Sequence, residues 1–470
     1  MTRRGWYTSV VIALVTSAGL SASPCAGQSA ASPRFQLSAD TALIDERVGI
    51  ALAGLSPGST VTIRLDGLGP VTGWRGKATF RADDRGLVDL TRMAPTTGSY
   101  SGVHAMGLFW SAMPDSGAAP LLTGGTRAPN AEAPPPQPWR FVAELDGSVV
   151  ATDTLWRRMV APGVTLTPVR ERGLVGTLYT PPDGGRHPAI IVLNGSQGGI
   201  ATPNMFPGGL ASRGFVVLSL GYFATDGLQP NLNRIPLEYF GTAISWLGQQ
   251  ASVDSARIGV LGQSRGAELA LVLGATFPSL HAVVAYVPSH VAWPGTLGDS
   301  TRAAAWTIAG KPVPTIDHLE SAAAVARYAG CPSAPTCSAP LTLHQFLALL
   351  DDSNAAARAE IPVERIRGGV FLLSGHEDGL WPSKLMAERI VARLRKHGFK
   401  YPVEHKSYAG AGHAIGRPYF STPYVARARQ HPITGRMVTQ GGTPEGTALA
   451  SEDSWPRVLA FLDAQLRSRR

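Results

Sequence analysis

Ser264, Asp378 and His413 are the residues whose types and order along the chain could carry out a reaction together. Ser264 lies in GQSRG, between two glycines, where the apolar run Ile258–Leu261 gives way to a helix-forming segment. A sharp strand-to-helix turn exposes a serine hydroxyl, and the start of the helix favours developing negative charge. The pattern predicts a nucleophile; the alternative is a tight turn that needs small residues.

A serine nucleophile needs a base, and the base needs an acid that orients it. The loop after the apolar run VFLLSG reads HEDGLWPS. Asp378 is the expected acid in this loop, Glu377 is its competitor, and His376 is expected to lie outside the site. The glycine-rich loop YAGAGHAIGRPYF presents His413 as the expected base, whereas His405 lies in a strand pattern and is interpreted as structural. The order Ser, Asp, His is that of α/β hydrolases.

Acyl transfer passes through an oxyanion, which needs two aimed hydrogen-bond donors. One expected donor is the backbone N–H of Arg265, the residue after the nucleophile. The second is expected in the loop NGSQGG, at Ser196 or, as the next choice, Gln197; the alternative is a plain glycine-rich loop. This chemistry requires no cofactor and no metal, and neither is predicted.

The elements around these residues predict two domains. Short alternating runs broken by turns such as SPGS and DDRG predict an all-β, immunoglobulin-like sandwich over residues 34–160, with a long loop at 115–138. From residue 163 to 470, continuous apolar runs alternate with helical patterns, which predicts an α/β domain with a doubly wound, mostly parallel sheet. Residues 290–362 interrupt this rhythm as a cap-like insertion, and a last helix is expected over residues 454–466.

The composition, the net charge and the N-terminal segment limit the class of protein. The chain has 470 residues, of which 44% are hydrophobic, and a net charge of +9 from scattered basic residues without a nucleic-acid motif, so no nucleic-acid partner is predicted. Residues 1–30 combine MTRR, a short apolar run and small residues, as a secretory signal peptide does. We expect export to the periplasm or the exterior, without stable membrane insertion once the signal is removed. Pro24 argues against a lipid anchor at Cys25.

Cys331 and Cys337 form an even pair, close in sequence, in a chain that is expected to be exported. Such a pair predicts one local disulfide, and two free thiols are the alternative.

Nine stretches between about residues 35 and 467 resemble the acyl-CoA thioesterase and bile acid-CoA:amino acid N-acyltransferase family. They are DERVGIALAGLSPGSTVTIR, FRADDRGLVDL, MGLFWSA, IPLEYFGTAISWL, GVLGQSRGAELAL, IPVER, SGHEDGLWPS, GAGHAIGRPYF and GGTPEGTALASEDSWPRVLAFL. The resemblance implies an α/β hydrolase behind a β-sandwich, with Ser264, Asp378 and His413 as the triad. Members that transfer the acyl group to an amino acid use Cys as the nucleophile, so Ser264 favours water as the acceptor.

The sequence therefore predicts an exported serine hydrolase that cleaves a small-molecule thioester, such as an acyl-CoA, or a carboxylic ester. Three alternatives stay open: an acyltransferase with an amine or alcohol acceptor, an oxygen-ester or lactone hydrolase, and an inactive binding module on a hydrolase scaffold. CoA esters are scarce outside the cytosol. The expected export therefore makes the family's fold and chemistry better expectations for this chain than the family's usual substrate.

Overall fold

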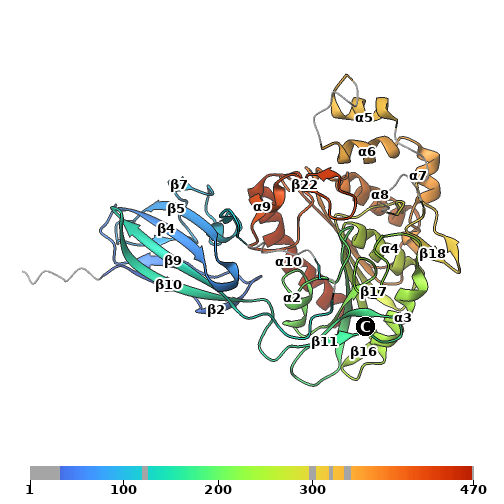
Figure 1. Ribbon diagram of the computed structural model, residues 1–470, viewed down its shortest axis with the longest axis horizontal. Helices are drawn as coiled ribbons and strands as arrows, with labels where there is room; N and C mark the ends of the chain where they lie inside the picture. Colours follow the sequence, from blue (N-terminus) through green and yellow to red (C-terminus); the bar gives the residue numbers. More distant parts are fainter. Residues whose placement is uncertain are drawn as a thin grey trace, which may run out of the picture.

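The computed structural model describes residues 32–118, 125–126, 128–295, 303–316, 321–332 and 340–467. The predicted signal peptide, Cys25 and Cys337 lie outside these residues. Figure 1 shows an all-β part (blue to teal) beside a larger part in which helices surround a sheet. This arrangement confirms the predicted fold class, an α/β hydrolase preceded by an all-β sandwich.

Two sheets share one core in the all-β part, because their short strands alternate buried and exposed side chains. One sheet has the order β1-β3-β6, with β1 Arg34–Leu37, β3 Ile50–Ala53 and β6 Val88–Asp89. The other has the order β2-β10-β9-β4-β5-β7, with β8 on β5. Its strands are β2 Thr41–Leu43, β4 Thr60–Gly67, β5 Trp74–Arg81, β7 Thr97–Gly98, β8 Met113–Pro114, β9 Gln137–Leu145 and β10 Ser148–Arg158; helix α1 spans Gly107–Trp110.

An eight-stranded sheet forms the centre of the second part, in the order β11-β12-β14-β13-β16-β17-β20-β21. β11 and β12 are antiparallel to each other and β12 is antiparallel to β14, whereas all neighbours from β14 to β21 are parallel. The strands are β11 Thr165–Val169, β12 Val175–Thr180, β13 His187–Leu193, β14 Val216–Gly221, β16 Val253–Gln263, β17 Leu280–Tyr286, β20 Gly369–Gly375 and β21 Val403–Tyr408. Because the parallel strands end at one edge, the loops after β13, β16, β20 and β21 meet there.

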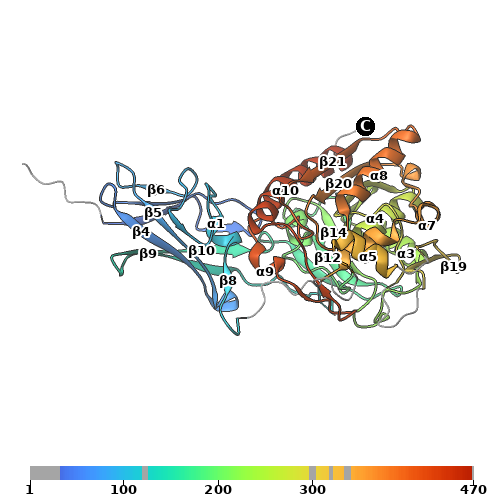
Figure 2. The same cartoon turned by 90° about the horizontal axis from the view of Figure 1, so that it is seen from above.

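Helices cover both faces of this sheet, which is why its central strands are apolar without interruption. Ile191 and Leu193 pack in the core formed with α3 (Leu237–Gly248), α4 (Arg265–Thr276) and α8 (Ser383–Lys396). Ile190 and Val192 pack in the core formed with α2 (Pro207–Ala211) and α10 (Pro444–Leu466). In Figure 2, α10 lies between the all-β part and the sheet.

The prediction for the last helix was wrong at its start, since α10 begins ten residues before Ser454, at Pro444. Thr443 is the N-cap, its side chain accepts from the Gly446 amide, and Pro444 occupies a first-turn position that suits proline. Pro456 lies inside the helix. An interior proline removes one helical hydrogen bond, so the sequence pattern resembled a helix start at that point.

The predicted cap region 290–362 contributes no strand to the eight-stranded sheet among its described residues. It contains the short elements β18 Trp306–Ile308, β19 Lys311–Pro312, α5 Ala322–Ala329, α6 Thr342–Leu349 and α7 Ser353–Ala359. β18 pairs with β15 (Ile235–Pro236), and the hairpin β22 (Arg429–Gln430) and β23 (Met437–Val438) follows α9 (Thr422–Ala426). In Figure 1, α5 and α6 stand above α8 and the β22 hairpin. In the described parts of the chain, no helix is long and apolar enough to span a membrane.

Candidate active site

Ser264 occupies the turn between β16 and α4. Its φ of 60° and ψ of −125° lie in a region that non-glycine residues rarely adopt. Neighbouring backbone closes around the turn: a Cβ on Gly266 would lie 2.4 Å from the Asn194 carbonyl oxygen, and a Cβ on Gly262 would lie 2.0 Å from that of Gly266. Both positions therefore require glycine, and the turn holds Ser264 at the carboxyl edge of the sheet.

Asp378 and His413 follow β20 and β21 at the same edge, and both are buried. Asp378 Oδ2 lies 2.8 Å from His413 Nδ1. The other carboxylate oxygen accepts from the amides of Leu380, at 2.9 Å, and Trp381, at 3.2 Å. When Nδ1 carries the ring proton, it donates a hydrogen bond to the Asp378 carboxylate. Nε2 is then the acceptor nitrogen of the ring.

The segment just before α10 holds the acid and base loops together. The Gln440 carbonyl accepts from the His413 amide at 2.7 Å, and Asp378 forms an isolated antiparallel bridge with Gly441. Gly441 has φ 66°, which suits glycine. The geometry of the Asp378–His413 pair thus depends on residues near the C-terminus.

The His413 ring packs edge-on against Trp381, with ring centroids 5.6 Å apart. The Trp381 indole donates to the Val287 carbonyl at 3.2 Å, which fixes that ring in turn. The Gln263 side chain donates to the Ile415 carbonyl at 3.0 Å and so joins the nucleophile turn to the histidine loop. His413 Nε2 is buried and has no hydrogen-bond partner among the described residues, so it can accept the proton of an approaching hydroxyl.

The competing residues of these loops point elsewhere. His376 and Glu377 are exposed, in contrast to buried Asp378. His405 lies in β21 with Nε2 2.9 Å from the Ser374 hydroxyl, and burial lowers its pKa.

No group of three or more His, Cys, Asp or Glu side chains able to hold a metal ion occurs in the part of the chain that the structure describes.

The loop of residues 194–200 leaves β13 beside the nucleophile. A Cβ on Gly195 would lie 3.3 Å from the Ser264 Cβ. The Tyr222 hydroxyl donates to the Asn194 carbonyl at 2.5 Å, and the Asn194 side-chain amide donates within the loop at 2.9 Å. Ser196, the predicted second oxyanion donor, therefore lies in an anchored loop next to Ser264.

Arg265, whose N–H is the other predicted donor, is the first residue of α4. A first-turn amide has no acceptor within its own helix and is directed out of the helix N-terminus.

His431, which the sequence analysis did not single out, anchors Ser196. Its Nε2 lies 2.7 Å from the Ser196 hydroxyl, and its Nδ1 accepts from the amides of Ile433, at 3.3 Å, and Thr434, at 3.2 Å. The proton of the neutral ring must then be on Nε2, which donates to Ser196. Burial, and then the charge of Arg429, lower the pKa of His431 to about 4, so the ring is neutral at pH 7.

The long loop of the all-β part reaches this site. Thr126 and Ile200 exchange two backbone hydrogen bonds of 2.9 Å each. A Cβ on Gly125 would lie 2.6 Å from the Asn194 side-chain nitrogen, and the Asn130 amide donates to the Thr177 hydroxyl at 2.9 Å. The sandwich thus contacts the loop that carries Ser196.

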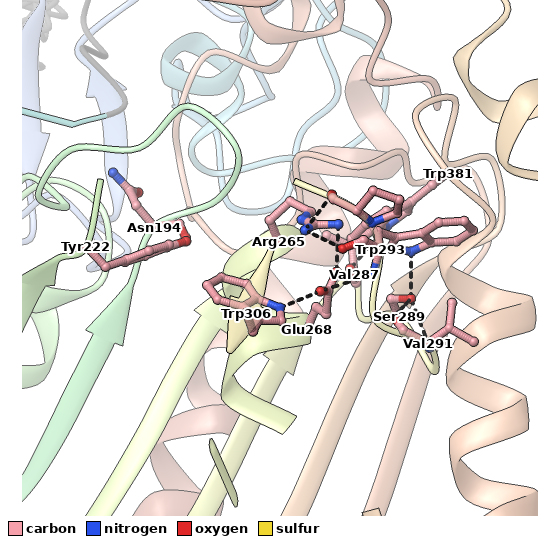
Figure 3. A network of polar contacts seen from close by, with 11 residues as sticks. Asn194, Tyr222, Arg265, Glu268, Val287, Ser289, Val291, Trp293, Trp306 and Trp381 are labelled. Carbon is pink, nitrogen blue, oxygen red and sulfur yellow. Dashed lines mark hydrogen bonds and ion pairs between the residues drawn. The ribbon is translucent and has the colours of Figure 1, made fainter. Parts of the chain in front are cut away.

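A buried ion pair joins the nucleophile helix to the first part of the cap region (Figure 3). Arg265 and Glu268 are 5% and 0% exposed, with Nη1 and Oε2 3.0 Å apart. Arg265 also donates to the carbonyls of Trp293, at 3.0 Å, and Pro294, at 3.1 Å, and the Trp306 indole donates to Glu268 at 2.9 Å. Burial raises the pKa of Glu268 to about 7, opposed by the charge of Arg265.

Sequence reasoning missed the residues that hold the site rather than form it: His431, Glu268, Trp381 and Thr126. Glu268 did leave a signal, because it is a carboxylate in the otherwise apolar helix segment GAELALVLGA. A carboxylate there needs a buried partner. Nothing in the sequence indicated that His431 and Thr126 meet the loop after β13.

Comparisons with known proteins match both parts of the chain. Residues 45–171 match the family described as "Acyl-CoA thioester hydrolase/BAAT N-terminal region", and residues 235–468 match "BAAT / Acyl-CoA thioester hydrolase C terminal". Acyl-coenzyme A thioesterase 1 of Mus musculus is 31% identical, over 90% of this chain and 94% of that protein. The mitochondrial acyl-coenzyme A thioesterase 2 of Mus musculus is 30% identical over 90% and 87%. The peroxisomal succinyl-coenzyme A thioesterase of Mus musculus is 29% identical over 90% and 94%.

Proposed function

Since this chain belongs to the acyl-CoA thioester hydrolase and BAAT family, we propose that it is a serine hydrolase that cleaves an acyl thioester through an acyl-enzyme. Its similar relatives include a succinyl-coenzyme A thioesterase and acyl-coenzyme A thioesterases, so the family relation points to a thioester and leaves the acyl group open. Water is the proposed acceptor, because the nucleophile position holds Ser264 and not cysteine.

In the proposed reaction, the Ser264 hydroxyl oxygen attacks the acyl carbon while His413 Nε2 takes its proton. The N–H groups of Arg265 and Ser196 hold the oxyanion. The leaving thiolate takes the proton from His413, and water then attacks the acyl-enzyme by the same route, releasing a carboxylic acid and restoring Ser264. Asp378 keeps His413 in the required tautomer and stabilises its charged form.

The observation that carries the proposal is the strained backbone of Ser264, at φ 60°, directly before α4. A plain turn with small residues would place glycine at such a position, since glycine adopts it without strain. The hydrogen-bonded pair of Asp378 and His413 on neighbouring strand ends supports the same reading.

The test compares the mature protein with Ser264→Ala on a long-chain acyl-CoA and on a p-nitrophenyl ester. We expect the variant to lose on the order of 10³-fold or more of kcat/KM with an unchanged melting temperature. Ser56→Ala, an exposed serine of the sandwich, is the control and should behave as the wild type. Acyl-CoA turnover that survives in Ser264→Ala would contradict the proposal. If neither substrate is turned over and a fluorophosphonate probe fails to label Ser264, the protein is a binding module.

Two further outcomes separate the neighbouring activities. If added glycine or taurine is acylated in place of water, the protein is an acyltransferase. Cleavage of only the p-nitrophenyl ester would indicate an oxygen-ester or lactone hydrolase. The signal-like residues 1–30 favour this second candidate, because oxygen esters are available outside the cytosol.

We also propose that the chain consists of a sandwich domain over 34–160 and a catalytic domain over 163–470, and that the cap at 290–362 belongs to the catalytic domain. We further propose that the protein is exported, that cleavage within residues 1–30 removes the signal peptide, and that Cys331 and Cys337 form a disulfide. Cys331 follows α5, whereas Cys337 lies outside the described residues. Intact mass of the secreted protein would give the cleavage site. Alkylation without a reductant should modify neither cysteine, and modification of both would exclude the disulfide.

A further inference from the structure

A cavity of about 50 Å³ lies between the sandwich and the catalytic domain, and the triad residues do not line it. Its walls come from both domains: Asp45, Phe109 and Arg157 on one side, and Arg417 and Tyr419 on the other. One water needs roughly 10–15 Å³ of cavity volume, so this cavity has room for several waters or for one small ion.

Arg157, from β10, is the most buried charge at this cavity. It is 2% exposed, and its guanidinium lies 5.3 Å from the Phe109 ring centre and 6.0 Å from that of Tyr419. Nη1 donates to the Glu46 carbonyl at 3.0 Å, whereas Nη2 is buried and has no hydrogen-bond partner among the described residues. A buried guanidinium N–H without an acceptor is costly, so the cavity favours an occupant that accepts hydrogen bonds.

Arg417 supplies a second buried donor from the loop that carries His413. Its Nε is buried and has no hydrogen-bond partner in the described parts of the chain. Within those parts, neither Arg157 nor Arg417 has a carboxylate within 4 Å. Two guanidinium groups thus face one small volume whose only lining carboxylate among the described residues, Asp45, attracts Arg157 but is already bound to Arg213. The positive charge is in excess there, which favours an anion.

Asp45 determines what kind of anion fits. Its Oδ2 is already bound by Arg213, at 2.7 Å, and by the Trp455 indole, at 2.6 Å. Its Oδ1 is buried and has no hydrogen-bond partner among the described residues, so it needs a donor. A fully deprotonated anion would repel this carboxylate oxygen, whereas an anion that carries a proton can donate to it.

We propose that this cavity binds one small protonated oxyanion of the hydrogen phosphate class, which accepts hydrogen bonds from Arg157 and Arg417 and donates one through its own O–H to Asp45. The bound ion links β10 of the sandwich to the loop that carries His413 and Arg417. The cavity is too small for a nucleotide, so the proposed ligand is a free inorganic ion rather than a phosphate group of a larger substrate. This inference does not depend on the proposed reaction.

The experiment follows thermal unfolding of the mature protein at pH 7.5, in a phosphate-free buffer, with phosphate, sulfate or chloride added at matched ionic strength. We expect a saturable rise in Tm of several degrees with phosphate, a smaller one with sulfate, and only an ionic-strength effect with chloride. Identical curves for the three salts would overturn the proposal and leave a water-filled cavity.

Variants locate the effect. Arg417→Gln should abolish the saturable phosphate response, whereas Arg429→Gln, a nearby arginine that does not line the cavity, should keep it. A wild-type response in Arg417→Gln would also overturn the proposal. If Arg417→Gln does not fold, calorimetric titration of Arg417→Lys with phosphate replaces it. We expect at least tenfold weaker binding there, because lysine lacks the guanidinium fork, and unchanged affinity would contradict the proposal.

Discussion

At the scale of single residues, burial distinguishes Asp378 from its neighbour Glu377. Asp378 and Glu377 are adjacent in HEDGLWPS, and sequence spacing left both open. In the structure, Asp378 is buried and hydrogen-bonded to His413, whereas Glu377 is exposed. Strand ends and chain order predicted Ser264 and His413, and the structure places both residues at the carboxyl edge of the sheet. Which of two adjacent carboxylates faces inward depends on the register of the loop, which no local pattern encodes.

We expect Asp378→Asn to lower kcat/KM by about 10²–10⁴-fold, because an amide at this position no longer favours the tautomer with its proton on Nδ1. Glu377→Gln is the matched control, one residue away, and should stay within about twofold of the wild type. Steady-state kinetics on the substrate that the wild type turns over measures both. Equal losses in the two variants would show that the loop, and not the carboxylate, matters.

His431 should make the protein less stable in acid. Its pKa in the folded state is about 4, below the ordinary value of 6.5. Between these values the unfolded chain binds more protons than the folded one, so this histidine's contribution to stability is full above pH 6.5 and is lost as the pH falls toward 4. We expect His431→Gln to flatten the dependence of Tm on pH in this window. Parallel profiles for the variant and the wild type would refute the assignment.

At the scale of elements, the first turn of α4 has a proposed role and an observed one. The backbone N–H of Arg265 is the proposed oxyanion donor, whereas its side chain and Glu268, three residues on, bind the cap region (Figure 3). The i,i+3 spacing of the pair can be read from the sequence. Its partners Trp293 and Trp306 lie 25 and 38 residues after Glu268 in the chain, so only the folded structure identifies them.

Removing the charge of Glu268 should destabilise the fold. At pH 8 the carboxyl is largely ionised, and we expect Glu268→Gln to cost about 3 kcal/mol, because Arg265 is then left buried without its counter-charge. Glu388→Gln removes the exposed partner of Lys384 and should cost less than about 1 kcal/mol. Urea unfolding of both variants gives the comparison. A cost for Glu268→Gln no larger than that of the surface control would mean that the buried pair contributes no net stability.

At the scale of the whole molecule, the two domains meet at several places. The sandwich loop pairs with the loop after β13 through Thr126 and Ile200, and Asp45 of the sandwich binds Arg213 and Trp455 of the catalytic domain. Alternation and turn residues predicted each domain's architecture, because those patterns are local. The contacts of Asn130, Thr126 and Asp45 with the second domain join residues 47 to 410 positions apart in the chain, and no sequence periodicity indicates them.

Thr126 tests whether the sandwich supports catalysis. Thr126→Pro removes the amide that donates to the Ile200 carbonyl, and we expect kcat to fall by roughly tenfold, because a displacement of about 1 Å at a positioned group costs up to 10²-fold. Thr126→Val keeps the amide and should retain near-wild-type kcat. Circular dichroism should show both variants folded. If Thr126→Pro keeps full activity, the pairing is only structural.

Because Gln440 and Gly441 hold the loops of Asp378 and His413 together, the site can form only late in the synthesis of the chain. The ribosome has to translate more than nine-tenths of the 470 codons before the segment that aligns acid and base exists, and α10, which follows it, comes last. If Ser264, Asp378 and His413 act as proposed, a nascent chain that still lacks this segment would be an inactive precursor. For a protein proposed to leave the cell, this order would keep a potential thioesterase away from cytosolic CoA esters without any separate inhibitor.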